Sequence, residues 1–285
     1  MEEEKRRQGG ATKKRKQNER DGENSDETGR SIRQKNARTH RSGAVMRSIS
    51  GIDMRILELL AKFRFAPIEV IRREALANQS AETARAYSLR RLKHLREMGL
   101  VDRQLVFGKA PVHFLTEEGA RLMGVEGGAG VGVRLAEYHH DLAVQNLYYA
   151  LRDRGDRPGL VTEREARAVT FDAAANDYAI RVTRSNGKQG WAWPDLVSGD
   201  VGALIGYEVE WSKKNRRRLI LLMHGYGYAA AYRIGVYLTT PDTRALVEGA
   251  AGEANATLAA RGLGRPILVR ALADITGRQC EGAAS

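Results

Sequence analysis

The sequence predicts two folded units of different class, an α+β unit in its first half and an α/β unit in its second. Apolar residues recur at helical spacing over residues 52–98 and then give way to two short β-like runs around Phe107-Gly108. From Arg134 onward, helical and strand-like patterns alternate, which is typical of an α/β domain. A glycine-rich stretch, 125–133, separates the two patterns and is expected to be a flexible linker.

The first 48 residues are rich in lysine and arginine and contain hardly any large apolar side chains. Such a segment cannot bury enough surface to offset the entropy lost on ordering, so we expect residues 1–48 to be a disordered basic arm. This arm either follows the phosphates of a nucleic acid or only keeps the protein in solution. At the other end, residues 277–285 are expected to be a tail. The net charge of +12 favours a polyanionic partner such as DNA.

The composition also restricts the compartment and the kinds of site. No run approaches the roughly 18 apolar residues of a membrane-spanning helix, and the charged N-terminus lacks the apolar core of a signal peptide. We therefore expect a cytoplasmic protein with no membrane partner. Cys280 is the only cysteine, which excludes an intrachain disulfide and a cysteine-rich zinc site.

The first unit, residues 49–124, is predicted to begin with three helices. They cover roughly residues 53–63, 67–76 and 80–98. Asp53 and Ser80 are residue types that cap helices, and Pro67 suits a first helical position. Gly99 is expected to end the third helix.

A hairpin follows these helices. Two β-like segments, 100–106 and 111–115, flank a turn that contains Phe107 and Gly108, and Thr116 then begins another helix. Three helices, a hairpin and a helix is the order of a winged helix domain, whose third helix enters the major groove of DNA while the hairpin touches the backbone. The candidate DNA contacts are the polar and basic side chains of these two elements, Thr83, Arg85, Arg90, Arg91, Lys93 and Lys109. The alternative is that several of them are only the solvated face of an amphipathic helix.

The second unit, residues 134–276, is predicted to alternate helices with strands. Helices are expected over residues 135–151, 213–230 and 242–261, and Ser212 is the expected cap of the second of these. Strands are expected over residues 160–169, 191–197, 203–211, 234–239 and 266–272.

Acidic residues end two of these strands, in Pro194-Asp195 and in Glu208-Val209-Glu210. Side chains two apart on a strand point to the same face, so Glu208 and Glu210 should lie together, and Asp195 joins them if the strands pair. Carboxylate oxygens are the ligands that Mg²⁺ prefers, and the bound ion lowers the pKa of an attacking water. Two lysines follow, so the residue inventory is that of a magnesium-dependent nuclease site.

This order of strands and acidic motifs, followed by a helix, resembles the PD-(D/E)xK nuclease superfamily, a restriction-endonuclease-like α/β fold. The resemblance implies that Asp195 and Glu208 bind Mg²⁺. Glu210 stands where that superfamily usually has its lysine, so Lys213 or Lys214 is the candidate for the missing cation. Either the site is active, with Asp195, Glu208, Glu210 and Lys213 as its catalytic residues, or it has decayed and the domain only binds.

Three further groups of charged residues accompany these acids. Glu163 and Glu165, on the strand predicted before them, are candidates for a fourth carboxylate. His139, His140 and Asp141 are neighbours on a helix and cannot all converge on one metal, so packed or capping histidines are expected. A basic run is expected either to contact phosphates, with Arg216 and Arg217 as DNA contacts, or to be solvated; it consists of Lys213, Lys214, Arg216, Arg217 and Arg218.

The arrangement from Met54 to Thr276 resembles the replication-relaxation family of bacterial plasmids and integrative elements. The residues that carry this resemblance are Arg90-Arg91-Leu92-Lys93-His94-Leu95, His140-Asp141-Leu142-Ala143-Val144, Pro194-Asp195, and Glu208-Val209-Glu210 with Lys213. It implies a protein that binds an origin-like site in plasmid replication or mobilisation and nicks it with Mg²⁺. The implied partners are double-stranded DNA, replication or relaxosome proteins, and a second copy in a homodimer.

Two other functions remain open at this point. One is a winged helix transcriptional regulator whose inactive nuclease-like domain serves dimerisation or effector binding. The other is a sequence-specific Mg²⁺ endonuclease with no role in replication.

Overall fold

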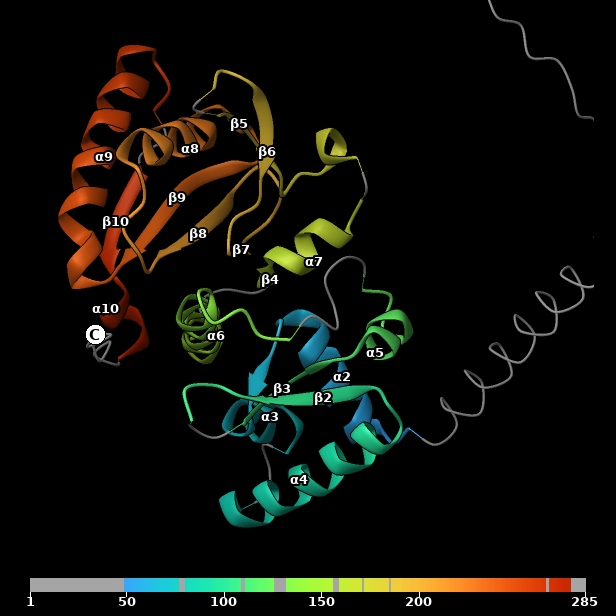
Figure 1. Ribbon diagram of the computed structural model, residues 1–285. Coiled ribbons are helices and arrows are strands. Elements are labelled where there is room, and N and C mark those ends of the chain that lie inside the picture. Colours follow the sequence, from blue (N-terminus) through green and yellow to red (C-terminus); the bar gives the residue numbers. More distant parts are fainter. Residues whose placement is uncertain are drawn as a thin grey trace, which may run out of the picture. The chain divides into compact units, whose positions relative to one another are not determined.

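The computed structural model describes residues 49–277 except 77–79, 109–110, 126–131, 156–158, 171, 185 and 265–266 (Figure 1). These residues belong to one compact unit, Ile49–Ser285. They form a mixture of helices and strands with several sheets, which agrees with the predicted α+β composition. The predicted basic arm, Lys109, most of the glycine-rich linker and the last eight residues of the tail lie outside the described residues.

Residues 49–125 contain the predicted helices and hairpin in the predicted order. The helices are α2 (Gly51–Lys62), α3 (Ile68–Ala75), α4 (Ala81–Glu97) and α5 (Glu117–Leu122). The strands β1 (Ala66–Pro67), β2 (Val101–Leu105) and β3 (Pro111–Leu115) form an antiparallel sheet in the order β1-β3-β2. Helix α4 lies at the lower end of Figure 1, with the other elements of this part on one side of it.

The start of α2 corrects one predicted cap. Ser50, not Asp53, is the N-cap: its hydroxyl accepts from the Asp53 N–H, and the Asp53 carboxylate accepts from the Ser50 N–H. Asp53 is fully buried, and Arg91 of α4 donates from Nε to its Oδ1 at 2.7 Å in an ion pair. Arg91, one of the predicted DNA contacts, is bound to Asp53 in this structure and so connects α4 to α2.

His113 lies buried in the middle of β3, and neither of its ring nitrogens has a hydrogen-bond partner among the described residues. Burial, and after it the positive charges of Arg96 and Arg103, lower the pKa of His113 from 6.5 to about 4. The ring is therefore neutral in the folded protein at any pH well above 4.

This histidine predicts a pH-dependent stability. The unfolded chain takes up a proton near pH 6.5 and the folded chain only near pH 4, so stability is present above this window and is lost as the pH falls through it. The loss from this residue between pH 7.5 and 5 is expected to be about 2 kcal/mol. Urea denaturation at the two pH values measures it. His113→Leu should lack this part of the pH dependence, and an unchanged dependence in that variant would contradict the assignment.

The rest of the chain is built around a five-stranded mixed sheet in the order β10-β9-β8-β7-β4. Its strands are β4 (Val161–Thr162), β7 (Leu196–Ser198), β8 (Leu204–Glu210), β9 (Tyr232–Thr239) and β10 (Ile267–Ala271). Strands β8, β9 and β10 are parallel, whereas β7 is antiparallel to both of its neighbours. A separate hairpin is formed by β5 (Ile180–Thr183) and β6 (Gln189–Ala192).

The helices of this part are α6 (Tyr138–Asp153), α7 (Glu163–Ala168), α8 (Arg216–Tyr228), α9 (Pro241–Ala260) and α10 (Leu272–Thr276), with a short 3-10 turn, η1 (Ala173–Ala175). In the part of the chain that the structure describes, no helix is both long and apolar enough to cross a membrane.

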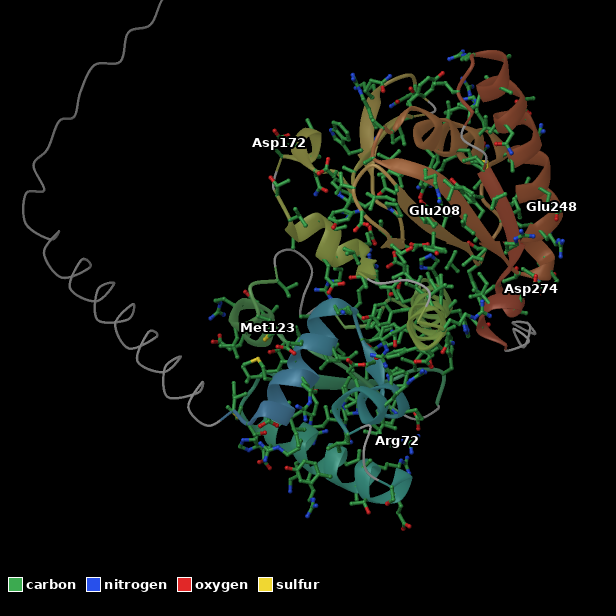
Figure 2. The ribbon with its side chains drawn as sticks, turned by 180° about the vertical axis from the view of Figure 1, so that it is seen from behind. Arg72, Met123, Asp172, Glu208, Glu248 and Asp274 are labelled. Atoms are coloured by element: carbon green, nitrogen blue, oxygen red, sulfur yellow. The ribbon has the colours of Figure 1, made fainter. Side chains whose placement is uncertain are left out.

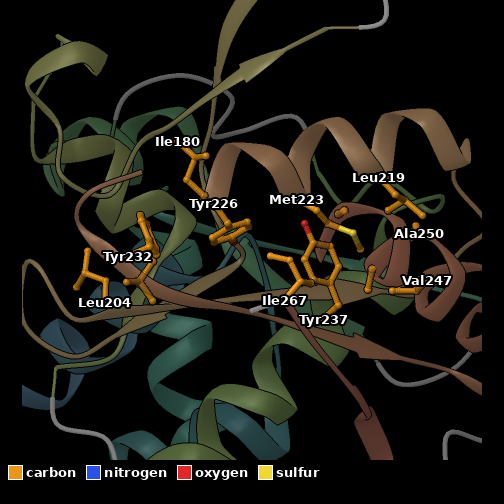
Figure 3. Packing of buried hydrophobic residues seen from close by; sticks show 13 residues of the cluster. Ile180, Leu204, Leu219, Met223, Tyr226, Tyr232, Tyr237, Val247, Ala250 and Ile267 are labelled. Atoms are coloured by element: carbon orange, nitrogen blue, oxygen red, sulfur yellow. The ribbon is translucent and has the colours of Figure 1, made fainter. Parts of the chain in front are cut away.

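An apolar core joins the sheet to α8 and α9 (Figure 3). The ring of Tyr226 on α8 lies across Gly206 of β8 and Gly235 of β9. A Cβ atom would come within 2.5 Å of this ring at Gly206 and within 3.0 Å at Gly235, so glycine at both positions allows α8 to approach the sheet. Even-numbered residues of β8 therefore face α8, and the residues between them point to the opposite face of the sheet.

The predicted strand over residues 160–169 is wrong. Only β4 is extended, and α7 starts directly after it, because Thr162 and Glu165 form a capping box that satisfies the first N–H groups of a helix. Glu163 and Glu165, predicted to lie on a strand near the other acids, are in the first turn of α7 instead. Glu165 lies 3.2 Å from Lys62 Nζ, and Glu163 accepts from Arg167 at 2.6 Å.

Two further boundaries differ from the prediction. The expected strand over 191–197 is interrupted at Trp193-Pro194-Asp195, so that β6 belongs to the separate hairpin and β7 to the large sheet. The expected helix over 213–230 starts at Arg216, because Asn215, and not Ser212, accepts the capping hydrogen bond. The prediction also missed β5 and α10.

Candidate functional site

Three carboxylates meet where β7 and β8 pair. Leu196 lies opposite Tyr207 in this antiparallel pair, so the same register places Asp195 opposite Glu208. Glu208 and Glu210 are both buried and point to the face of the sheet that carries α8. The predicted convergence of these residues, called the carboxylate site below, is present, and Figure 2 shows Glu208 among the strands of the sheet.

Asp195 is held by a histidine that the sequence reasoning did not assign to the site. His140 Nε2 lies 3.2 Å from Asp195 Oδ2, and its Nδ1 lies 3.5 Å from Asp141 Oδ1. Burial opposes the charged form of His140, but the hydrogen bonds to Asp141 and Asp195 outweigh it and raise its pKa to about 10. The same Asp195 oxygen accepts the backbone N–H of Val209 at 2.7 Å. An imidazolium thus neutralises Asp195.

The prediction kept His140 out of the site because neighbouring helical residues diverge. They do diverge: His140 turns to Asp195, whereas the ring of His139 stacks on Trp211. The spacing of the three residues shows only that they cannot all contact one metal ion. It does not indicate that His140 contacts Asp195.

Glu208 has a hydroxyl donor from α8. Tyr226 donates from its hydroxyl to Oε1 of Glu208 at 2.8 Å, and both groups are buried. Burial and the nearby charge of Asp195 raise the pKa of Glu208 well above its ordinary value. The site therefore favours the protonated form of Glu208, and the sequence reasoning missed Tyr226 as its partner.

Glu210 is paired with Lys214. Lys214 Nζ donates to Oε1 of Glu210 at 2.9 Å, whereas Oε2 is buried with no hydrogen-bond partner among the described residues. Burial works against the charge of Lys214, but Glu210 and Glu208 outweigh it and raise the pKa of this amine. Lys213, the predicted catalytic cation, is exposed to solvent. The lysine of the site is therefore Lys214, in the segment between β8 and α8.

The oxygen donors of the carboxylate site suit Mg²⁺ in their chemistry, and Oε2 of Glu210 is a buried oxygen without a hydrogen-bond partner in the part of the chain that the structure describes. Within the described ranges, however, no three His, Cys, Asp or Glu side chains are arranged to hold a metal ion. His140, Tyr226 and Lys214 satisfy the carboxylates instead. Binding of Mg²⁺ therefore requires the contacts with His140 and Lys214 to open.

The β2–β3 hairpin is joined to this region by stacked rings. His139 lies between Phe107 of the hairpin turn and Trp211, with ring centroids 5.5 Å and 5.7 Å away and interplanar angles of 13° and 9°. Phe107 adopts a left-handed backbone conformation with φ 52°. The hairpin turn thus packs on α6 and, through His139, on the residue that follows Glu210.

Helix α4 has one exposed face. Its predicted contacts Thr83, Arg85, Arg90 and Lys93 are all exposed, and Leu89 lies exposed among them. The buried side of the helix consists of Ala84, Ser88, Leu92 and Leu95. Apart from Arg91, the predicted contacts of this helix therefore point away from the core.

The residues of the predicted basic run, at and just before the start of α8, differ in whether they are paired with acids or exposed to solvent. Lys214 belongs to the carboxylate site, and Arg216 lies 2.8 Å from Glu253 of α9. Arg217 and Arg218 are exposed. The predicted phosphate contact at Arg216 is thus already paired with an acid, whereas Arg217 faces solvent.

Comparison with protein-family models, with characterised proteins and with solved structures finds no match to this chain. The resemblance to replication-relaxation proteins therefore stays a prediction.

Proposed function

We propose that this protein binds double-stranded DNA through a winged helix domain formed by residues 49–125, with α4 as the recognition helix. The element order and the sheet order β1-β3-β2 support this assignment. The observation that carries the proposal is the outward face of α4, where Arg85, Arg90 and Lys93 are exposed together with Thr83. A role in plasmid replication or mobilisation, with the partners this implies, rests on the sequence resemblance.

The chemistry of this face matches the major groove. Arginine can donate two hydrogen bonds to one guanine, and lysine neutralises a phosphate and releases its counterions. The acids of this helix lie near its two ends: Glu82 is in the first turn, and Glu97 lies 3.9 Å from Lys93 in an exposed ion pair that a phosphate could replace. Because Phe107 is stacked against His139, the hairpin turn is held at α6, whereas α4 keeps an exposed face.

A salt titration tests the proposal. Anisotropy of a fluorescent duplex of about 20 base pairs is measured with the full-length protein, and each phosphate neutralised adds about −0.9 to the slope of log K against log salt. The three cations of α4 alone predict a slope of about −3. An affinity that does not change with salt, or no binding at low salt, would overturn the proposal.

We infer as a second activity Mg²⁺-dependent DNA cleavage at the carboxylate site. The observation that favours it is the convergence of Asp195, Glu208 and Glu210 beside a lysine, with Oε2 of Glu210 unpartnered among the residues that the structure describes. Asp195 and Glu208 would hold Mg²⁺, which when bound stabilises charge on a phosphate and activates a water. Lys214, released from Glu210, would offset the charge of the phosphate.

Supercoiled plasmid provides the test of cleavage. Wild type with Mg²⁺ is expected to convert it to the nicked form, and Asp195→Asn should lower that rate at least about 100-fold while DNA binding is kept, because a metal ligand is lost. Glu248→Gln on α9 is the control, since this exposed acid pairs only with Arg244 in the described residues. Plasmid that stays intact while it is bound would exclude cleavage and favour the transcriptional regulator.

A further inference from the structure

The face of the five-stranded sheet that points away from α8 contains a cavity of about 290 Å³. Its floor consists of the apolar side chains Ile205, Ile234, Val236 and Leu268, from three adjacent parallel strands. Leu151 of α6 and Ile275 of α10 form its walls. The cavity lies on the opposite side of β8 from the carboxylate site, because odd-numbered residues of β8 line it while Glu208 and Glu210 face α8.

Tyr207 and three arginines complete the lining, which contains no acidic residue among the described residues. Arg154 Nη2 donates to the backbone carbonyls of Asp274 and Ile275 at 3.2 Å and 2.9 Å, so this arginine connects α6 to α10 at the end of the cavity. The side chains of Arg233 and Arg270 are exposed and have no ion-pair partner in the described ranges. Two free guanidinium groups therefore border an apolar floor.

The position of Arg233 results from an irregularity in β9. Leu204 pairs with Tyr232, but the next residue, Ile205, pairs with Ile234, so Arg233 is an extra residue in this strand. Such a bulge redirects a side chain and places Arg233 at the cavity beside Ile234. In a regular strand Arg233 would alternate with Ile234 and point to the face covered by α8.

We propose that this cavity binds a small amphipathic anion, with a compact apolar body on the floor and a carboxylate or similar acid at one of the two arginines that border it, Arg233 at one end and Arg270 at the other. The volume is at the lower end of the roughly 300–1,000 Å³ of small-molecule sites. Burial of the apolar body removes the floor from water, and a charge-assisted hydrogen bond to arginine orients the acid. The site is independent of DNA binding and of the carboxylate site.

Two probes with the same apolar body test the proposal on the full-length protein. 2-Naphthoate carries the acid, and 2-naphthalenemethanol is its neutral counterpart; binding of each is measured by isothermal titration calorimetry. We expect one naphthoate site per chain. The double variant R233Q/R270Q should weaken naphthoate binding by about tenfold or more, since both guanidinium groups are lost, and change binding of the alcohol by less than about twofold.

The matched control is R181Q/R184Q, which removes two exposed arginines from the β5–β6 hairpin and changes the net charge equally. An equal loss of naphthoate affinity in both double variants would mean that only net charge matters and would overturn the proposal. Absence of saturable naphthoate binding by wild type would also overturn it. Competition by duplex DNA, lost in R233Q/R270Q, would assign these arginines to DNA instead.

Discussion

Replacement of Arg85, Arg90 and Lys93 together by glutamine is expected to weaken binding to duplex DNA by roughly 100-fold or more at 0.1 M salt. Each contact of this kind contributes at least about 1 kcal/mol, and three of them together reach that factor. The slope of log K against log salt should also become shallower by about 3, because three fewer counterions are released. All three side chains are exposed on α4, and glutamine has nearly the same helix propensity as arginine and lysine, so the fold should persist. Anisotropy titrations over a range of salt measure both changes.

The control for this prediction removes the same charges elsewhere. Arg181, Arg184 and Lys188 are exposed in or next to the β5–β6 hairpin, and their joint replacement by glutamine also lowers the net charge by three. This variant should keep most of the affinity. If the two triple variants lose affinity equally, the affinity for DNA depends only on the overall charge of the protein, and α4 is not the recognition helix.

Replacement of Arg91 by methionine is expected to lower the free energy of unfolding by about 3 kcal/mol, near the low end for breaking a buried ion pair. The reason is that Asp53, which is 0% exposed, loses its cation while it remains inside the protein. The N–H and hydroxyl of Ser50 still donate to Asp53, which keeps the loss from being larger. Urea denaturation followed by circular dichroism provides the measurement.

Two further variants show whether loss of the Arg91–Asp53 ion pair causes the loss of stability. Arg90→Met, at the next position but on the exposed face, should change stability by no more than about 0.5 kcal/mol. Addition of Asp53→Asn to Arg91→Met should recover part of the lost stability, because the buried group is then neutral. If Arg90→Met and Arg91→Met change the free energy of unfolding equally, the ion pair with Asp53 does not stabilise the fold. Arg91 is then as available for DNA as Arg90.

The elements predicted correctly are those whose signals are local. Ser80 and Thr116 each accept a hydrogen bond from an N–H three residues on, and helices start where these residues predict. The same local rule applies at Thr162 and Glu165, whose capping box starts α7 inside the segment 160–169 that was predicted to be a strand. The hydrogen-bonded cap determines the structure at this point of the chain.

The composition of the carboxylate site follows from contacts between distant parts of the chain. The period of two on β8 was enough to place Glu208 and Glu210 on one face. Asp195 joins them only through the pairing of β7 with β8, and His140 reaches it from a helix 55 residues earlier in the chain. Local spacing cannot specify such a partner, because the pairing depends on which surfaces pack together.

Pairs of adjacent residues of the same type show most clearly what the sequence determines and what the tertiary structure determines. The sequence by itself determined that α4 is a basic helix and that lysines follow the last acid of β8. Only the tertiary structure decided that Arg91 is bound to buried Asp53 while Arg90 is exposed, and that Lys214 and not Lys213 pairs with Glu210. The physical reason is that a buried charge has lost its water and needs an opposite charge beside it. Which charges are buried depends on how the chain packs, and the local sequence does not determine this.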